Sequence, residues 1–221
     1  MANAARDLYY LLSRNYGERA AIKTVGDRYR LVQRQRCALR RIVSPQNEIK
    51  VIRSREVARE ILGPEILLID GFNLLILAEV ALSGGFIFEC LDGTFRDIAS
   101  IHGSYRRIAE TPDAILLIGE QIRQIPVKQT QWFLDQPVSN SGRLRQLIQE
   151  IAIHHGWPWS VELYHDADQA LIHRTSGVIA TSDRHVLARC SRWVNLAYSI
   201  ISASGNPNLI TLDDLGLNAL S

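Results

Sequence analysis

Four aspartates occupy positions from which they could hold a divalent cation together. Asp70 follows the apolar run ILLI, Asp135 follows WFL, Asp168 lies just past VELYH, and Asp183 follows VIATS. Each position lies at or just beyond the carboxyl end of a segment that we predict to be a strand. The carboxyl ends of parallel strands share one edge of a sheet. If these strands are neighbours, at least three of the carboxylates converge.

Convergence of carboxylates has an energetic consequence. Two like charges about 4 Å apart repel by roughly 4 kcal/mol at an effective dielectric constant of 20, so such a group either takes up protons or binds a cation. Ligand sets made only of oxygen favour Mg²⁺ or Mn²⁺ over zinc. A bound ion of this kind can activate water and clamp a phosphate. The simpler interpretation of any one of these aspartates is a helix N-cap, and Asp183 in TSDRHV is the clearest case.

The elements that would position these acids alternate along the chain after Gly63 and Pro64. We predict strands over residues 65–70, 86–90, 127–135, 159–168 and 177–183. Between them we predict helices over 71–82, 111–122, 139–156, 168–172 and from 184 onward, with Ser141 as a cap and Gly156 as a stop. Strands that alternate with helices of this length imply parallel pairing with right-handed crossovers. The sequence therefore predicts an α/β fold with a Rossmann-like, three-layer parallel sheet.

The first 60 residues differ from the remainder in pattern and charge. Apolar residues recur there at helical spacing, and 14 Lys or Arg stand against 6 Asp or Glu, a net charge of +8. Residues 61–221 carry 11 basic and 17 acidic residues, a net charge of −6. We predict a basic helical N-terminal segment, 1–60, before an α/β domain, 61–221. The arginines around Tyr29 could follow a nucleic-acid backbone, or could simply form a solvated helix face.

The order of four short motifs resembles the NYN branch of the PIN-like nuclease superfamily. The motifs are LLIDGFN, WFLD, DADQAL and VIATSD, and together they cover roughly residues 65–190. This resemblance implies a PIN-like parallel sheet and metal-dependent hydrolysis of a phosphodiester, usually in RNA. It assigns Asp70, Asp135, Asp168 and Asp183 as catalytic metal ligands, with Asn73 shaping the first turn. The chain as a whole, including its leader and LDQPVSNSGRL, also resembles a prokaryotic family of unknown function.

Two further acids lie in ECLDGTFRDI, a departure from the simplest NYN pattern. Asp92 could join the metal ligands, or could only begin a turn with Gly93; Asp97 is a weaker candidate. Asp166 precedes Asp168 by two residues and could take its place, although helix phasing favours Asp168.

A group of small polar and basic residues is a candidate for binding the substrate phosphate. Helix amino ends that carry such residues bind phosphate well, and the stretch after Asp135 opens a helix. Ordinary loop and cap chemistry would explain the same residues. The candidate substrate-binding residues are Asn73, Ser139, Asn140, Ser141, Arg143, Ser182 and Arg184.

The composition indicates in which cellular compartment we expect the protein. The chain has three cysteines, far apart and without a CxxC pair, so a disulfide framework or thiolate zinc site is not expected. Charges interrupt the most apolar region, which argues against a membrane span. The start, MANAARDLYY, shows no secretory signal pattern. We expect a cytoplasmic protein; its oligomeric state stays open, a homodimer included.

We therefore predict a Mg²⁺- or Mn²⁺-dependent nuclease that acts on nucleic acid, in particular RNA. One alternative is a catalytically inactive RNA-binding or adaptor protein with a PIN-like fold. A lesser alternative is a haloacid-dehalogenase-type phosphatase, because ECLDGT partly matches that family's DxDGT motif. Cys90, however, stands where that motif has its nucleophilic aspartate.

Overall fold

The computed structural model describes residues 1–98, 105 and 108–220. Its contacts divide the chain into two units, which interleave along the sequence. We call the first the helical unit; it comprises Met1–Ser54, Gly85–Ile98 and Pro207–Ser221. We call the second the sheet unit; it comprises Arg55–Gly84 and Ala99–Asn206. Two segments later in the chain, Gly85–Ile98 and Pro207–Ser221, group with the N-terminal helices in the helical unit.

The sheet unit is built on four parallel strands, β1 (Ile66–Asp70), β4 (Gln129–Asp135), β5 (Trp159–Tyr164) and β6 (Val178–Ala180). Their spatial order is β5-β4-β1-β6. The chain thus moves from β1 outward to β4 and β5 and then returns to β6 on the other side of β1. The point where this order reverses, between β1 and β6, is where ligands usually bind in parallel sheets. The predicted α/β fold with a parallel sheet is confirmed, and that sheet has four strands.

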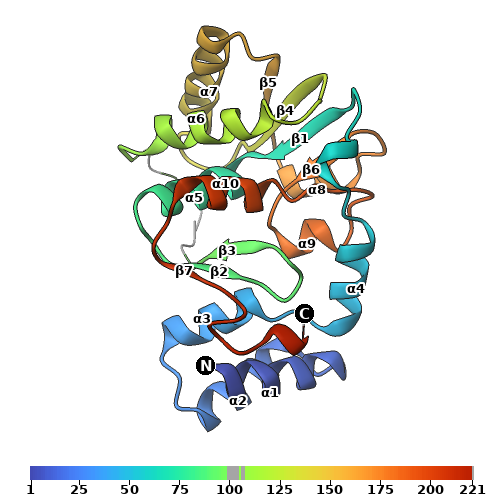
Figure 1. Cartoon of the computed structure of the whole chain (residues 1–221), viewed down its shortest axis with the longest axis vertical. Helices are drawn as coiled ribbons and strands as arrows, with labels where there is room; N and C mark the ends of the chain where they lie inside the picture. Colours follow the sequence, from blue (N-terminus) through green and yellow to red (C-terminus); the bar gives the residue numbers. More distant parts are fainter. Residues whose placement is uncertain (99–104, 106–107, 221) are drawn as a thin grey trace. The chain divides into compact units, whose positions relative to one another are not determined.

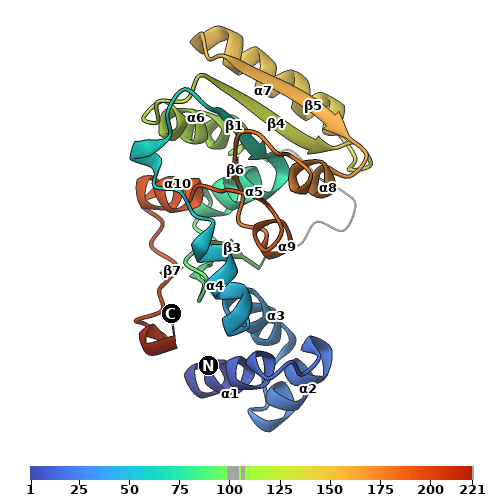
Figure 2. The same cartoon turned by 90° about the vertical axis from the view of Figure 1, so that its right-hand side faces the viewer.

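Helices connect these strands and cover both faces of the sheet (Figures 1 and 2). Along the crossovers from β1 to β5, α5 (Gly71–Leu82) packs beside α6 (Thr111–Ile122), and α6 packs beside α7 (Ser141–His155). The short α8 (Ala167–Ile172) packs against β1, β4 and β5 and against α9 (Arg184–Leu187), whereas α10 (Leu196–Ser204) packs on α5 and α6. A 3₁₀ turn, η1 (Arg59–Ile61), precedes β1. The middle residues of β4, Trp132 and Phe133, point to opposite faces and are both fully buried, as expected for a sheet covered on both sides.

Two of the glycines at helix ends in this unit, Gly71 and Gly156, meet backbone requirements that a residue with a Cβ atom would not. A Cβ atom on Gly71 would lie 2.8 Å from the carbonyl oxygen of Phe133, so only glycine lets the start of α5 pass so close to β4. Gly156 adopts φ 64° as the C-cap of α7, the left-handed conformation that favours glycine and that ends the helix where the sequence predicts.

The helical unit contains the predicted N-terminal helices, α1 (Ala2–Ser13), α2 (Glu18–Arg28), α3 (Gln33–Ile42) and α4 (Gln46–Ser54). A small second sheet with the order β3-β2-β7 belongs to the same unit. Its strands are β2 (Ile87–Glu89), β3 (Phe95–Asp97) and β7 (Leu209–Ile210), and a 3₁₀ turn, η2 (Asn218–Leu220), follows. Figure 1 shows β2, β3 and β7 side by side.

One sequence-based prediction about this unit is wrong. Residues 86–90 do not add a strand to the parallel sheet, because β2 pairs with β3 and β7 instead. The C-terminal segment packs on the N-terminal helices: Leu212 and Leu217 are buried in the core that also contains Leu8, Leu39 and Ile42. Burying one such leucine stabilises a fold by roughly 1.5–3 kcal/mol.

The helices of the described residues are short or carry charges. Across residues 1–98, 105 and 108–220, none combines the length and apolar character that crossing a bilayer requires.

Candidate metal and phosphate site

The carboxyl edge of the parallel sheet brings the four predicted aspartates into one region. Asp70 is the last residue of β1, Asp135 is the last residue of the neighbouring β4, and Asp183 follows the other neighbour, β6, by three residues. Asp168 is the second residue of α8, which packs against β1 and β4. Three adjacent strands and one short helix therefore direct four acids to the point where the strand order reverses.

The four acids interact electrostatically. Burial raises the pKa of Asp70 well above its ordinary value, and repulsion from Asp168, Asp183 and Asp135 adds to that rise. Burial also raises the pKa of Asp168 to about 6, with further contributions from Asp183, Asp135 and Asp166. The pKa of Asp135 is raised too, chiefly by burial and less by Asp166. Mutual repulsion of this kind is what carboxylates experience when no cation compensates them.

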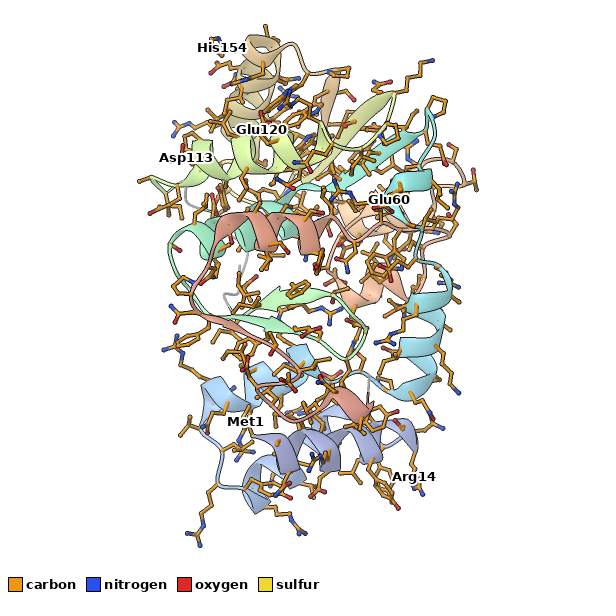
Figure 3. The ribbon with its side chains drawn as sticks, in the orientation of Figure 1. Met1, Arg14, Glu60, Asp113, Glu120 and His154 are labelled. Carbon is orange, nitrogen blue, oxygen red and sulfur yellow. The ribbon has the colours of Figure 1, made fainter. Side chains whose placement is uncertain are left out.

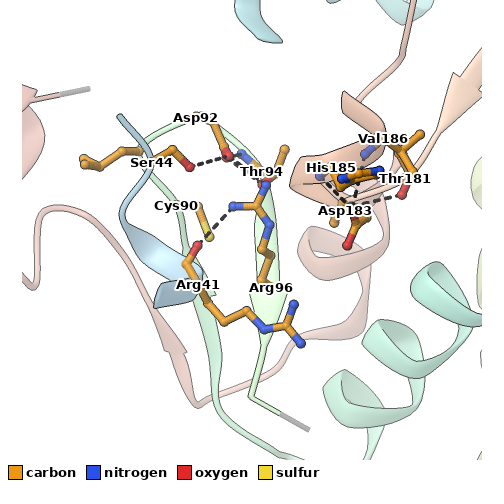
Figure 4. A network of polar contacts seen from close by, with 12 residues as sticks. Arg41, Ser44, Cys90, Asp92, Thr94, Arg96, Thr181, Asp183, His185 and Val186 are labelled. Atoms are coloured by element: carbon orange, nitrogen blue, oxygen red, sulfur yellow. Dashed lines mark hydrogen bonds and ion pairs between the residues drawn. The ribbon is translucent and has the colours of Figure 1, made fainter. Parts of the chain in front are cut away.

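Asp70, Asp135 and Asp183 each use one carboxylate oxygen for hydrogen bonds within the protein. The Oδ1 atom of Asp135 accepts a bond from the Ala167 amide at 2.9 Å. The Oδ1 atom of Asp183 accepts bonds from the first turn of α9, at 2.7 Å from His185 and 3.2 Å from Val186 (Figure 4). Asp183 is thus the N-cap that its sequence context suggests, and its Oδ2 atom is not used by that cap.

Asp166 and Asp168 have different roles. The side chain of Asp166 caps α8 by accepting a hydrogen bond from the Gln169 amide at 2.9 Å. Asp168 lies two residues further along, in the first turn of the helix, where it is half-buried and repelled by the other acids. This division agrees with the helix phasing that favours Asp168 as the ligand and leaves Asp166 as the cap.

Thr181 is the residue of this region that the sequence analysis missed. Its buried hydroxyl donates to Oδ2 of Asp70 at 2.6 Å and accepts from the Asp183 amide at 3.0 Å. This bond to the charged form lowers the pKa of Asp70, against the larger effect of burial. Beside it, Oδ1 of Asn73 accepts from the Ser182 amide at 2.7 Å, so Asn73 joins the first turn of α5 to the end of β6. The available signal was the hydroxyl two residues before Asp183.

The donor atoms suit a hard divalent cation, but they do not form a closed ligand set as they stand. All four groups are carboxylates, which Mg²⁺ and Mn²⁺ prefer. Among residues 1–98, 105 and 108–220, however, no three His, Cys, Asp or Glu side chains are placed closely enough to hold an ion. Asp70, Asp135, Asp168 and Asp183 could hold one only if some of the carboxylates rotate toward one another.

The predicted phosphate-binding stretch opens α7 directly after Asp135. Ser139 and Arg143 are exposed, whereas Ser141 is buried and donates to the Gln136 carbonyl at 3.1 Å. Ser141 is not the cap that we predicted: the N-cap is Asn140, in the left-handed conformation, and its amide donates to the Tyr105 carbonyl at 3.0 Å. Asn140 and Ser141 therefore form hydrogen bonds that stabilise the loop itself.

The remaining substrate-binding candidates flank Asp183. Ser182 is buried before it, and Arg184 is partly exposed as the first residue of α9.

Asp92 belongs to the helical unit, and its carboxylate is fully engaged there. Oδ2 accepts from the Arg96 guanidinium at 2.7 Å and from the Ser44 hydroxyl at 3.3 Å, whereas Oδ1 accepts from the Thr94 hydroxyl at 2.7 Å (Figure 4). Against the cost of complete burial, Arg96 holds the pKa of Asp92 below its ordinary value. We therefore leave Asp92 out of the proposed metal ligands. Its neighbour Asp97 ends β3.

The same surroundings argue against a phosphatase centred on ECLDGT. Cys90 occupies the position of the nucleophile and is fully buried, which raises the pKa of its thiol to about 12. A buried neutral thiol beside a buried ion pair can neither reach a phosphate nor attack it.

Several arginines of the basic N-terminal segment form ion pairs or packing contacts within the protein. Arg36 donates to Asp27 at 2.9 Å and packs over Gly26, and Arg40 pairs with Glu18 at 2.7 Å. Exposed basic residues remain, among them Arg14, which lies over the ring of Tyr10 (Figure 3). The predicted nucleic-acid contacts of the leader therefore reduce to a smaller group of arginines than the sequence suggests.

This fold and this edge define an α/β protein with a four-stranded parallel sheet and an N-terminal helical segment. The chain belongs to the family described as Domain of unknown function (DUF5616), whose model matches residues 59–199, more than half of its length. Residues 1–55 match a second family, described as Protein of unknown function (DUF434).

The chain is also similar to a protein from the archaeon Methanocaldococcus jannaschii, Uncharacterized protein MJ0935. The two are 29% identical over 184 residues, which cover 83% of this chain and 87% of the relative. No solved structure matches the chain significantly.

Proposed function

We propose that this protein is a PIN-like, metal-dependent nuclease that hydrolyses phosphodiester bonds, with RNA as its main substrate. The observation that carries the proposal is the placement of Asp70, Asp135 and Asp183 at the ends of three adjacent parallel strands, with Asp168 beside them. The DGFN, WFLD, DADQAL and TSD motifs, which resemble the NYN branch, supply exactly the residues that meet at this edge.

In the proposed mechanism the four aspartates hold Mg²⁺ or Mn²⁺. When bound, such an ion lowers the pKa of water and offsets the negative charge that develops on the phosphate. Thr181 fixes the orientation of Asp70 through its hydroxyl, and Asp183 is oriented by its bonds to α9. Asn73 ties the two segments together, so that the distance between Asp70 and Asp183 is set by the backbone rather than by loose side chains.

The charge balance of the chain fits a nucleic-acid substrate. The acids attract a cation but repel phosphate, so a polyanion would need basic groups elsewhere on the protein. The helical segment supplies them, and we propose that its exposed arginines contribute sequence-independent affinity. Such affinity falls as salt rises.

The decisive experiment combines metal binding with cleavage. We expect labelled single-stranded RNA to be cleaved with Mn²⁺ and to remain intact with EDTA. Asp70→Asn and Asp135→Asn should lose cleavage, and calorimetry should show weaker Mn²⁺ binding for both. Asp113→Asn is the matched control, because Asp113 is an exposed aspartate at the start of α6 (Figure 3). Cleavage that persists in EDTA, or in Asp70→Asn, would refute the mechanism.

One observation favours a second candidate, a nucleic-acid-binding or adaptor protein of the same fold without catalysis. In the described residues the carboxylates do not already form a ligand set for a metal ion. The calorimetric experiment separates the two candidates, because an inactive protein would bind RNA without binding Mn²⁺ at Asp70.

A further inference from the structure

The guanidinium of Arg174 is held in a fixed position on the face of the sheet that carries Asp135. Its Nη2 atom donates to the Tyr164 hydroxyl at 3.0 Å, and its Cζ atom lies 5.2 Å from the centre of the Phe133 ring. The Phe133 and Tyr164 rings stack with their centres 4.5 Å apart and an interplanar angle of 8°. Two rings and a hydroxyl thus define where this cation sits.

The Tyr164 hydroxyl is saturated by its neighbours. It donates to Oε2 of Glu162 at 2.7 Å and accepts from Nε2 of Gln131 at 3.2 Å as well as from Arg174. A phenol offers one donor and two acceptor positions, so all three are used. Because each partner fixes the hydroxyl further, the guanidinium has little freedom to swing away from it.

Most of the N–H donors of Arg174 form no hydrogen bond within the described residues. A guanidinium has five N–H donors in a planar fork, a geometry that matches phosphate. Within the part of the chain that the structure describes, Tyr164 accepts from one of them, and no carboxylate forms an ion pair with Arg174. Its side chain is also partly exposed. A fixed, partly exposed arginine without an ion-pair partner is well suited to bind an anion.

This cation lies close to the acidic edge. Tyr164 is the register partner of Asp135, and both side chains therefore lie on the same face of the sheet. Arg174 follows α8, whose first turn carries Asp168. The four helical positions from Asp168 to Ile172, the last residue of α8, correspond to about 6 Å, and Arg174 lies two residues further along the chain. A ligand that reaches both groups is therefore larger than a single phosphate.

We propose that Arg174, held by Tyr164 over Phe133, is a positioning residue that binds a backbone phosphate of a single-stranded nucleic acid next to the phosphate at the acids. This inference rests on the proposed nuclease function and specifies its substrate as a strand rather than a mononucleotide. A contact to phosphate carries no sequence information, so the preference is for strand length and not for particular bases.

The first test measures binding without cleavage. Fluorescence anisotropy of a labelled single-stranded RNA, in EDTA and over a range of salt concentrations, is compared for wild type and Arg174→Ala. We expect Kd to rise about tenfold, the effect of one charge-assisted contact. The slope of log K against log salt should fall by about 0.7. Arg174→Lys should keep the slope and lose part of the affinity, because it keeps the charge but not the fork.

Matched variants separate a positioning role from a structural one. Arg123→Ala removes an exposed arginine of the same unit, which pairs with Glu120, and should change neither Kd nor slope. Tyr164→Phe removes the hydroxyl that holds Arg174 and should weaken binding with the slope unchanged. Thermal unfolding of each variant establishes that it is folded.

The outcomes distinguish this inference from the proposed nuclease function. If RNA is not cleaved with Mn²⁺ but Kd and slope depend on Arg174, the nuclease proposal fails and the strand-binding role stands. If Arg174→Ala matches Arg123→Ala in both quantities, or wild type does not bind RNA, the inference is overturned. Where cleavage occurs, Arg174→Ala should raise KM with little change in kcat on long RNA, and should not alter the already weak binding of a mononucleotide.

Discussion

Replacing Asp168 with asparagine is expected to stabilise the metal-free protein at neutral pH, although it removes a proposed ligand. Burial and the charges of Asp183, Asp135 and Asp166 raise the pKa of Asp168 to about 6, against a value of 3.8 for an unperturbed aspartate. A raised pKa means that the folded state holds the proton more tightly than the unfolded state. The contribution of Asp168 to the free energy of unfolding is therefore favourable below about pH 4 and is lost as the pH rises through about 6.

The size of the effect follows from that difference. A shift of roughly two pKa units corresponds to about 3 kcal/mol before screening by solvent. Because Asp168 is only partly buried, about 1–2 kcal/mol is a more realistic repulsion. The carboxylate also lies in the first turn of α8, where it gains about 0.3–1 kcal/mol from the helix dipole. The net stabilisation of Asp168→Asn is then on the order of 1 kcal/mol, or about 2–4 °C in Tm.

Urea unfolding in EDTA measures this difference at neutral pH and again near pH 4, where it should largely disappear. Asp113→Asn is the matched control, because Asp113 is exposed in the first turn of α6 and loses the same dipole interaction without relief of repulsion. If Asp168→Asn is no more stable than Asp113→Asn at neutral pH, the four carboxylates do not share one electrostatic field. The site as described would then be wrong.

Three further substitutions probe other parts of the fold. Thr181→Val keeps the shape of the side chain but removes its bonds to Asp70 and to the Asp183 amide; it should cost about 1–3 kcal/mol in urea unfolding, whereas Thr181→Ser should be close to wild type. Asp92→Ala removes the carboxylate that forms the ion pair with buried Arg96 and should cost about 3–5 kcal/mol by the same assay, and a loss below 1 kcal/mol would contradict a buried ion pair. Burial raises the pKa of Glu79, so the contribution of Glu79 to the free energy of unfolding declines as the pH rises through its raised pKa. Glu79→Gln lacks this titration and should therefore gain stability relative to wild type as the pH rises. Parallel pH profiles of stability for the two proteins would contradict the raised pKa.

The parallel sheet could be predicted because β1 and the second half of β4 are short apolar runs that each end in an aspartate. The runs before Asp70 and Asp135 are buried on both faces, as their uninterrupted apolar character suggests. The aspartates themselves mark where the chain leaves the sheet. Their convergence followed from a general property of parallel sheets, that every carboxyl end lies on one edge. Sequence alone thus identified the four strands that form this sheet and the edge at which they end, but it also assigned residues 86–90 to the sheet, which they do not join.

Other features depend on contacts between segments far apart in sequence. Residues 86–90 resemble a strand of the main sheet by composition, and only their pairing with Leu209–Ile210 places them elsewhere. Asp92 resembles a ligand until Arg96, four residues away, is seen to neutralise it. Thr181 was missed because hydroxyl residues are common in loops, and its bond to Asp70 spans 111 residues. Long-range pairing decides each of these cases, and no local pattern encodes it.

Two aspartates with almost equal burial illustrate why the sheet edge is a candidate site and the ECLDGT segment is not. Asp92 is 0% exposed and Asp70 is 4% exposed, so both pay a large desolvation cost. Arg96 compensates the charge of Asp92, and the pKa of Asp92 is lowered. Burial and the charges of three other acids raise the pKa of Asp70. The first arrangement stabilises the fold on its own, whereas the second is costly until protons or a cation arrive. A fold that places this uncompensated acid where its strand order reverses has the property that cation-dependent chemistry on a phosphate requires.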